Sequence, residues 1–125
     1  MDFTYDPQNI FARILRGEIP NKTVFENEHA LAFHDIAPQA PVHVLVIPKG
    51  PYVSMADFTA KASATEIAGF FSAVGTTARE LGLDEPGYRL ISNHGKDAFQ
   101  EVPHFHVHIF GGRPMRGMLA KPKAD

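Results

Sequence analysis

The chain has 125 residues, of which 44% are hydrophobic and 21% are charged, and its formal net charge is −2. This composition is far from that of disordered chains, and the length predicts a single domain over residues 1–125. No basic bias is present, so we expect no nucleic-acid partner and no attraction to an acidic membrane. The absence of cysteine excludes disulfides, a thiol nucleophile and cysteine-ligated zinc.

The sequence shows no sign of membrane insertion or export. No apolar run approaches the ~20 residues that span a bilayer. Residues 1–6 contain neither the basic nor the apolar segment of a signal peptide. We therefore expect a cytoplasmic protein.

The first predicted elements are a short helix and two strands. Asp6 suits the N-cap and Pro7 the first helical position, after which apolar residues recur at helical spacing until Gly17 ends the helix. Residues 23–26 and 30–34 predict two strands joined by a tight turn. The short link implies that these strands pair antiparallel.

The middle of the chain predicts a buried strand and a long helix. Residues 42–47 are almost all apolar, which is typical of a central strand covered on both faces, and His43 is the one polar residue among them. Ser63 and Glu66 have the spacing of a capping box, and apolar residues at helical spacing follow until Gly82.

The last predicted elements are strands at residues 88–93 and 104–110, followed by a short tail through residue 125. The order α, β, β, β, α, β, β predicts an α+β domain in which the long helix packs on one face of an antiparallel sheet.

Three histidines alternate with apolar residues in the last predicted strand. Alternate residues of a strand share a face, so His104, His106 and His108 point one way while Phe105 and Val107 point toward the core. Imidazole is suited to proton transfer, metal binding and nucleophilic attack near neutral pH. From the residues alone, all three chemistries remain open.

A zinc site is the main alternative to phosphorus chemistry at these histidines. Same-face positions lie roughly 6.6–6.8 Å apart along a strand, which is too wide for three of them to converge easily on one tetrahedral ion. An imidazole attacks phosphorus well when its other nitrogen donates to a carbonyl, and N–H groups in the polar loop after Asn93 suit a charged phosphate. We expect no metal and no cofactor.

The segment from His104 to Phe110 resembles the histidine-triad signature, His-x-His-x-His-x-x with apolar x. Further stretches are similar to the Hint branch of that superfamily, the histidine-triad nucleotide-binding proteins or purine nucleoside phosphoramidases: residues 9–11, 17–20, 31–41, 43–49 and 111–113. The resemblance covers about residues 9–119.

The resemblance implies a fold and an activity. The implied fold is α+β, with a five-stranded antiparallel sheet, one long and one short helix, and a homodimer that joins two sheets. The implied activity is hydrolysis of purine nucleoside 5'-phosphoramidates, which are AMP or GMP linked to an amine, and of aminoacyl adenylates. A nucleotidyl-histidine would be the intermediate.

The resemblance also implies roles for individual residues. His106 would attack the α-phosphorus while the His104 carbonyl orients it, His108 would contact the phosphate, and His43 would complete the cluster. Asp35 would bind both ribose hydroxyls, a sensible role for an acceptor-only group. The walls of the base pocket would be Ile10, Phe11, Phe33, His34 and Ile36.

The phosphate and leaving-group side would involve Asn93, Phe99, Gln100 and Glu101. Phe99 stands where the family commonly has glycine, so only its backbone N–H could make the usual contact. Glu101 stands where animal members have serine, and an anion there favours a cationic amine. Other hypotheses about the function remain open: a dinucleoside polyphosphate hydrolase or nucleotidyl transferase of the same superfamily, a nucleotide-binding interaction module, or a zinc protein.

Overall fold

The computed structural model describes residues 3–119, which form five strands, three α-helices and one short 3-10 helix. The strands are β1 (Thr23–Glu26), β2 (Ala30–His34), β3 (Val42–Pro48), β4 (Arg89–Ile91) and β5 (Val107–Gly111). The helices are α1 (Ile10–Leu15), α2 (Met55–Lys61), α3 (Ala64–Glu80) and the 3-10 helix η1 (Lys96–Ala98). The end of the predicted tail, residues 120–125, lies outside the described part.

The strands form one antiparallel sheet in the order β1-β2-β3-β5-β4. The predicted α+β fold with a five-stranded antiparallel sheet is therefore confirmed. β3 is the middle strand, and its residues from His43 to Pro48 are buried, as its apolar sequence predicts. The pairing of β3 with β5 brings His43 opposite Phe110 and Leu45 opposite His108.

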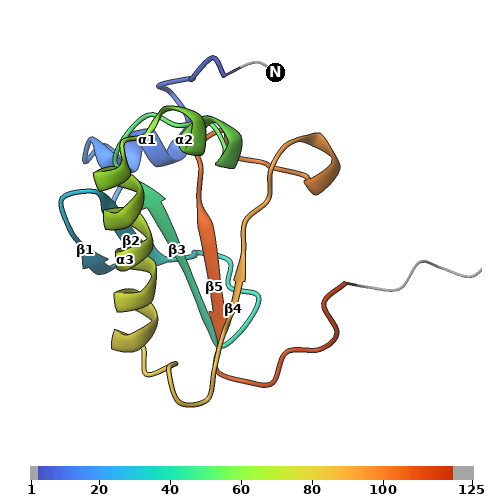
Figure 1. Ribbon diagram of the computed structural model, residues 1–125. Helices are drawn as coiled ribbons and strands as arrows, with labels where there is room; N and C mark the ends of the chain where they lie inside the picture. Colours follow the sequence, from blue (N-terminus) through green and yellow to red (C-terminus); the bar gives the residue numbers. More distant parts are fainter. Residues whose placement is uncertain (1–2, 120–125) are drawn as a thin grey trace, which may run out of the picture.

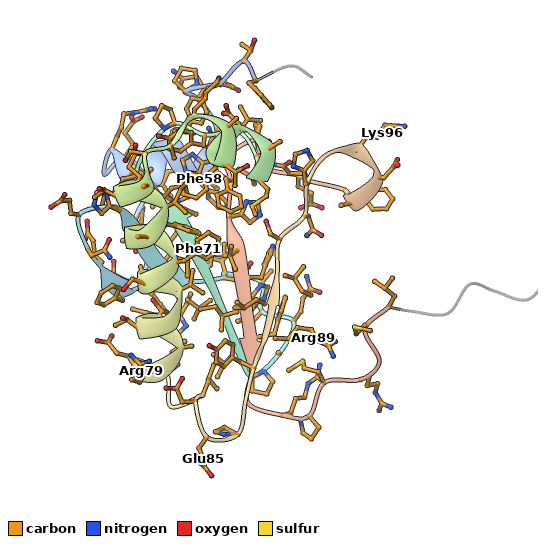
Figure 2. The ribbon with its side chains drawn as sticks, viewed as in Figure 1. Phe58, Phe71, Arg79, Glu85, Arg89 and Lys96 are labelled. Carbon is orange, nitrogen blue, oxygen red and sulfur yellow. The ribbon has the colours of Figure 1, made fainter. Side chains whose placement is uncertain are left out.

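One face of the sheet packs against α3, which lies over β1, β2 and β3 (Figure 1). Apolar residues from β2, β3 and β5 meet the buried side of α3 there. Three rings form the centre of this core: Phe105 stacks on Phe58 at 5.0 Å between centroids, and Phe70 lies 5.2 Å from Phe105. Phe58 of α2 and Phe71 of α3 lie close to this core in Figure 2.

The opposite face packs against α1. Phe11 and Ile14 cover a second apolar cluster formed by Leu31, Phe33, Leu45 and Ile47. Because directly paired residues of antiparallel strands share a face, His108 lies on this face together with Leu45. The second face therefore combines a small apolar core with the histidines.

α1 begins later than the sequence predicts. Its N-cap is Asn9, whose side chain accepts a hydrogen bond from the Ala12 N–H at 3.0 Å. Asp6, the predicted cap, instead accepts from the Gln8 N–H in a turn before the helix. The predicted stop at Gly17 is confirmed, since its φ of +79° is a left-handed conformation that favours glycine.

The structure adds a second short helix, α2, that the sequence pattern did not indicate. Ser54 caps it by accepting from the Asp57 N–H, and Phe58 is its buried apolar residue. The predicted capping box of α3 is confirmed, with both reciprocal bonds between Ser63 and Glu66 present. In the part of the chain from residue 3 to residue 119, no helix is long and apolar enough to cross a membrane.

We predict that Ser63→Ala lowers the free energy of unfolding by about 1 kcal/mol, because the Glu66 N–H loses its acceptor at the start of α3. Ser72→Ala, on the exposed side of the same helix, is the matched control and is expected to have little effect or to stabilise. Urea unfolding of both variants measures the difference. Equal stability of the two variants would contradict the capping role.

Candidate functional site

The backbone before β5 keeps the predicted alternation although the regular strand begins only at Val107. The Phe105 N–H donates to the Tyr52 carbonyl at 2.8 Å, and Phe105 packs in the core under α3. The ring of His106 points the other way, 5.0 Å from the ring of Phe11 between centroids. The predicted strand over residues 104–110 is thus too long at its start, but the predicted faces are correct.

His106 is held in one tautomer by a backbone carbonyl. Its Nδ1 lies 2.7 Å from the His104 carbonyl oxygen, which can only accept, so Nδ1 carries the proton. Nε2 is therefore unprotonated. Within residues 3–119, Nε2 has no hydrogen-bond partner and is not a fully buried atom. Its lone pair therefore reaches solvent, although the side chain as a whole is only 7% exposed.

His104 is fully buried, and both of its ring nitrogens are paired. Nε2 lies 2.9 Å from the Pro48 carbonyl oxygen and must donate its proton to it. Nδ1 is then an acceptor, and the Tyr5 hydroxyl donates to it at 2.6 Å. These two contacts fix the His104 ring, and the backbone carbonyl of the same residue orients His106.

His43 and His108 are joined directly. The Gln39 N–H donates to Nδ1 of His43 at 3.1 Å, so the His43 proton is on Nε2. That Nε2 donates to Nδ1 of His108 at 2.9 Å, which leaves the His108 proton on its own Nε2. The Asp35 carboxylate lies 3.4 Å from the same His43 Nε2. His108 consequently presents an N–H donor beside the His106 acceptor, with 5.0 Å between the ring centroids.

Burial keeps the four imidazoles neutral. It lowers the pKa of His104 to about 4, with the nearby His106 adding to the shift. Burial, together with His106 and His43, lowers the pKa of His108 to about 4. Burial also lowers the pKa values of His106 and His43, against a smaller opposing effect of Asp35. Near neutral pH the cluster therefore contains lone pairs and N–H donors rather than imidazolium ions.

A cleft of about 720 Å³ adjoins the His43 end of the cluster. Four predicted site residues line it, namely His34, Asp35, Ile36 and His43, together with Pro20, Asn21, Lys22, Pro38 and Pro41. One oxygen of Asp35 accepts from the Ala37 N–H at 2.8 Å, which fixes the carboxylate at the cleft. The exposed Ile36 side chain, 95% accessible, gives the cleft an apolar edge.

The predicted aromatic residues of the base pocket lie together next to the nucleophile candidate. Phe11 and Phe33 are buried and meet edge to face at 5.8 Å between centroids. Phe11 also contacts the ring of His106. Ile10, beside Phe11, is 42% exposed. Phe11 thus contacts both Phe33 and His106.

The loop around η1 projects from the sheet, with Lys96 near its tip (Figure 2). Gln100 braces this loop: its amide accepts from the Gly95 N–H at 3.0 Å and donates to the Val53 and Val102 carbonyls. The Phe99 N–H donates to the Lys96 carbonyl at 3.1 Å. The group expected to contact substrate is therefore engaged within the loop. The Phe99 ring is 84% exposed.

Asn93 and Glu101 flank the same loop. Asn93 is half-buried, and its side chain makes no hydrogen bond within residues 3–119. Glu101 is exposed. The substrate contacts expected of Asn93, Phe99, Gln100 and Glu101 stay predictions.

One group in the described part of the chain could hold a metal ion. The nearest ligand atoms of Asp35, His43 and His108 lie within 4.8 Å of one another. In the structure His43 Nε2 and His108 Nδ1 are bonded to each other, so an ion bound through these two nitrogens would have to replace that bond. The prediction of a metal-free site remains a prediction.

The structure also adds contacts that sequence reasoning missed. Tyr5 is separated from His104 by 99 positions, and no local pattern connects them. The donor that sets the His43 tautomer is the backbone of Gln39, which no side-chain motif reveals. The Ser92 hydroxyl donates to the His106 carbonyl at 2.8 Å and ties the end of β4 to the histidine segment.

We predict that acid destabilises the protein through His104. Its folded-state pKa is about 4 against an ordinary value of 6.5, so the unfolded state binds more protons and stability falls as the pH drops from about 6.5 to about 4. For this residue alone, the free energy of unfolding should fall by about 2 kcal/mol between pH 7 and pH 5. Urea unfolding at both pH values checks it, and His104→Gln should flatten the dependence by that amount. An unchanged dependence in the variant would contradict the assignment.

Comparison with known proteins identifies the family. The HIT domain model matches residues 16–115. A relative from Azospirillum brasilense, an uncharacterized HIT-like protein, is 66% identical over 94% of this chain and 97% of its own length. The purine nucleoside phosphoramidase of Escherichia coli is 39% identical over 90% of this chain and 94% of its own length. The crystal structure of a HIT family hydrolase from Legionella pneumophila superposes with a TM-score of 0.80 at 40% identity, covering 87% of this chain and 96% of that one. The chain belongs to the HIT domain family.

Proposed function

We propose that this protein hydrolyses purine nucleoside 5'-phosphoramidates, and the corresponding aminoacyl adenylates, through a nucleotidyl group on His106. The observation that supports this most is the 2.7 Å contact between His106 Nδ1 and the His104 carbonyl. It leaves a neutral Nε2 with a lone pair that reaches solvent, which is the form of imidazole that can attack phosphorus. The similarity to the Escherichia coli phosphoramidase supports the choice of a P–N bond.

The proposed first step is attack of His106 Nε2 on the α-phosphorus. An N–P bond forms, the P–N bond to the amine breaks, and the electron pair leaves with the amine nitrogen, which takes up a proton from solvent. The His106 Nδ1–H bond to the carbonyl stabilises the positive charge that develops on the ring. The His108 Nε2–H donates to a non-bridging oxygen.

In the second step water replaces the histidine. The oxygen of water attacks phosphorus, the bond to Nε2 breaks, and its electrons return to the imidazole. AMP or GMP is released and a proton passes to solvent. Because His106 starts and ends neutral, the depressed pKa of the buried ring favours regeneration of the nucleophile.

We assign the nucleoside to the cleft and the aromatic residues beside it. The Asp35 carboxylate accepts from the two ribose hydroxyls, and the base packs on Ile10, Phe11, Phe33, His34 and Ile36. Asn93 binds the phosphate with its free amide, and the loop with Phe99, Gln100 and Glu101 faces the leaving amine. The site needs no cofactor.

We also infer that the protein is a homodimer that works in the cytoplasm. β4 is one of the two edge strands of the sheet, and the side chains of Leu90 and Ile91 are exposed along it. A second copy of the chain pairing at this edge would extend the sheet and cover these apolar groups.

We predict that His106→Ala lowers kcat for an adenosine 5'-phosphoramidate by at least about a thousandfold, since the attacking atom is removed. His29→Ala is the control, because His29 lies beside Glu28 and Gly69, outside the histidine cluster. Comparable rates for wild type and His106→Ala would overturn the nucleophile assignment.

A panel with diadenosine polyphosphates tests the substrate class, and faster hydrolysis of those substrates would favour the other branch of the superfamily. AMP binding without turnover of any substrate would favour a binding module.

A second expected outcome concerns the ribose. Asp35→Asn keeps the side chain's shape but removes the charge that strengthens hydrogen bonds to the two hydroxyls. KM should rise roughly tenfold or more, with a smaller change in kcat. Asp84→Asn, on the surface beside Arg79, is the matched control and should leave both constants unchanged. An unaltered KM in Asp35→Asn would place the ribose elsewhere.

A further inference from the structure

The segment before α1 is attached to the rest of the molecule at several points. The Lys61 ammonium of α2 lies 5.0 Å from the centre of the Phe3 ring, and Arg16 donates to the Pro7 carbonyl at 2.7 Å. Neither contact involves the hydroxyl of Tyr5, which lies between Phe3 and Pro7 in the sequence. Removing that hydroxyl leaves both contacts in place, and besides the bond to His104 it removes a side-chain hydrogen bond with Asn9.

The Tyr5 hydroxyl is used at the histidine site. It lies 2.6 Å from His104 Nδ1, and the two rings meet edge to face with 5.6 Å between centroids. Since His104 Nε2 donates to the Pro48 carbonyl, Nδ1 must accept, and Tyr5 must be the donor. Burial raises the pKa of the Tyr5 phenol, so the group remains a donor near neutral pH.

Loss of this donor would leave a buried acceptor unpaired. His104 has 0% exposure, so water does not replace the hydroxyl without a local rearrangement. A change of the His104 tautomer or a rotation of its ring would break the bond to Pro48. Either response disturbs the residue whose backbone carbonyl holds the proton of His106 Nδ1 at 2.7 Å.

We propose that Tyr5 is a positioning residue of the histidine site: its hydroxyl holds His104 in the Nε2–H form, and so keeps the His104 carbonyl aligned on His106 Nδ1. The N-terminal segment thereby becomes part of the active site without touching substrate. The effect on catalysis rests on the proposed function, whereas the effect on the tautomers of His104 and His106 does not.

The test compares Tyr5→Phe with Tyr52→Phe. Both variants lose one hydroxyl that makes a 2.6 Å hydrogen bond, but the Tyr52 hydroxyl donates to Glu66 of α3, away from the histidines. Long-range ¹H–¹⁵N spectra report which imidazole nitrogen carries each proton. In wild type we expect His104 protonated on Nε2 and His106 on Nδ1. In Tyr5→Phe the His104 nitrogen shifts should change and His106 should gain an Nε2–H population, while Tyr52→Phe keeps the wild-type pattern.

The same three proteins are assayed with an adenosine 5'-phosphoramidate. Tyr5→Phe should lower kcat by roughly threefold to tenfold, the range of one lost hydrogen bond, with KM unchanged. Unchanged His106 tautomers or an unchanged kcat in Tyr5→Phe overturns the proposal. If the wild-type protein hydrolyses no phosphoramidate, the proposed function fails, and the spectra alone then decide the positioning role.

A second variant covers the case in which Tyr5→Phe does not fold. The chain has three tyrosines, so Tyr52→Phe combined with Tyr88→Phe leaves Tyr5 alone to be labelled with 3-fluorotyrosine. The more acidic phenol is a stronger donor and keeps every contact of the ring. A shift of the His104 Nδ1 resonance on fluorination supports the bond, and an unshifted resonance overturns it.

Discussion

The hydrogen bond from His106 Nδ1 to the His104 carbonyl is the constraint on which the rest of the site depends. A neutral histidine whose nitrogens have no fixed partner populates both tautomers. In one of them the attacking nitrogen would carry the proton and could not act as a nucleophile. Here one backbone oxygen at 2.7 Å fixes the proton and leaves the other nitrogen free. The carbonyl is in turn held because the His104 side chain is bonded at both nitrogens in the core.

The fold keeps the four imidazoles neutral, as this arrangement requires. β3 and β5 pair at the middle of the sheet, so His43 and His108 meet on the face that also holds α1 and its apolar cluster. Desolvation disfavours imidazolium at all four histidines, and the chain of donors from Gln39 through His43 to His108 is consistent with neutral rings. The result is a lone pair and an N–H donor side by side near neutral pH. An anionic phosphate would meet both.

Much of this could be predicted from the sequence because the patterns involved are local. Alternation placed His104, His106 and His108 on one face, the apolar run from Val42 identified the central strand, and the Ser63 capping box marked the start of α3. Short helices were harder. Asn9 competes with Asp6 as a cap, and α2 has too few apolar positions to show a helical period.

The long-range contacts could not be predicted from the sequence. No spacing rule connects Tyr5 to His104, and the Gln39 donor is a backbone group present in any sequence. Gln100 illustrates a residue that the sequence did single out. A residue that the family resemblance assigns to substrate is used in this structure to brace its own loop. How such a loop folds back on itself is not encoded in a motif.

The central claim is that His106 Nε2 forms a bond to phosphorus. Rapid quenching during turnover of an adenosine 5'-phosphoramidate, followed by peptide mapping at a pH that preserves phosphohistidine bonds, tests it most directly. The account predicts one nucleotidyl group per active site, located on Nε2 of His106. A nucleotidyl group on another histidine, or turnover in which no histidine becomes modified, would contradict it.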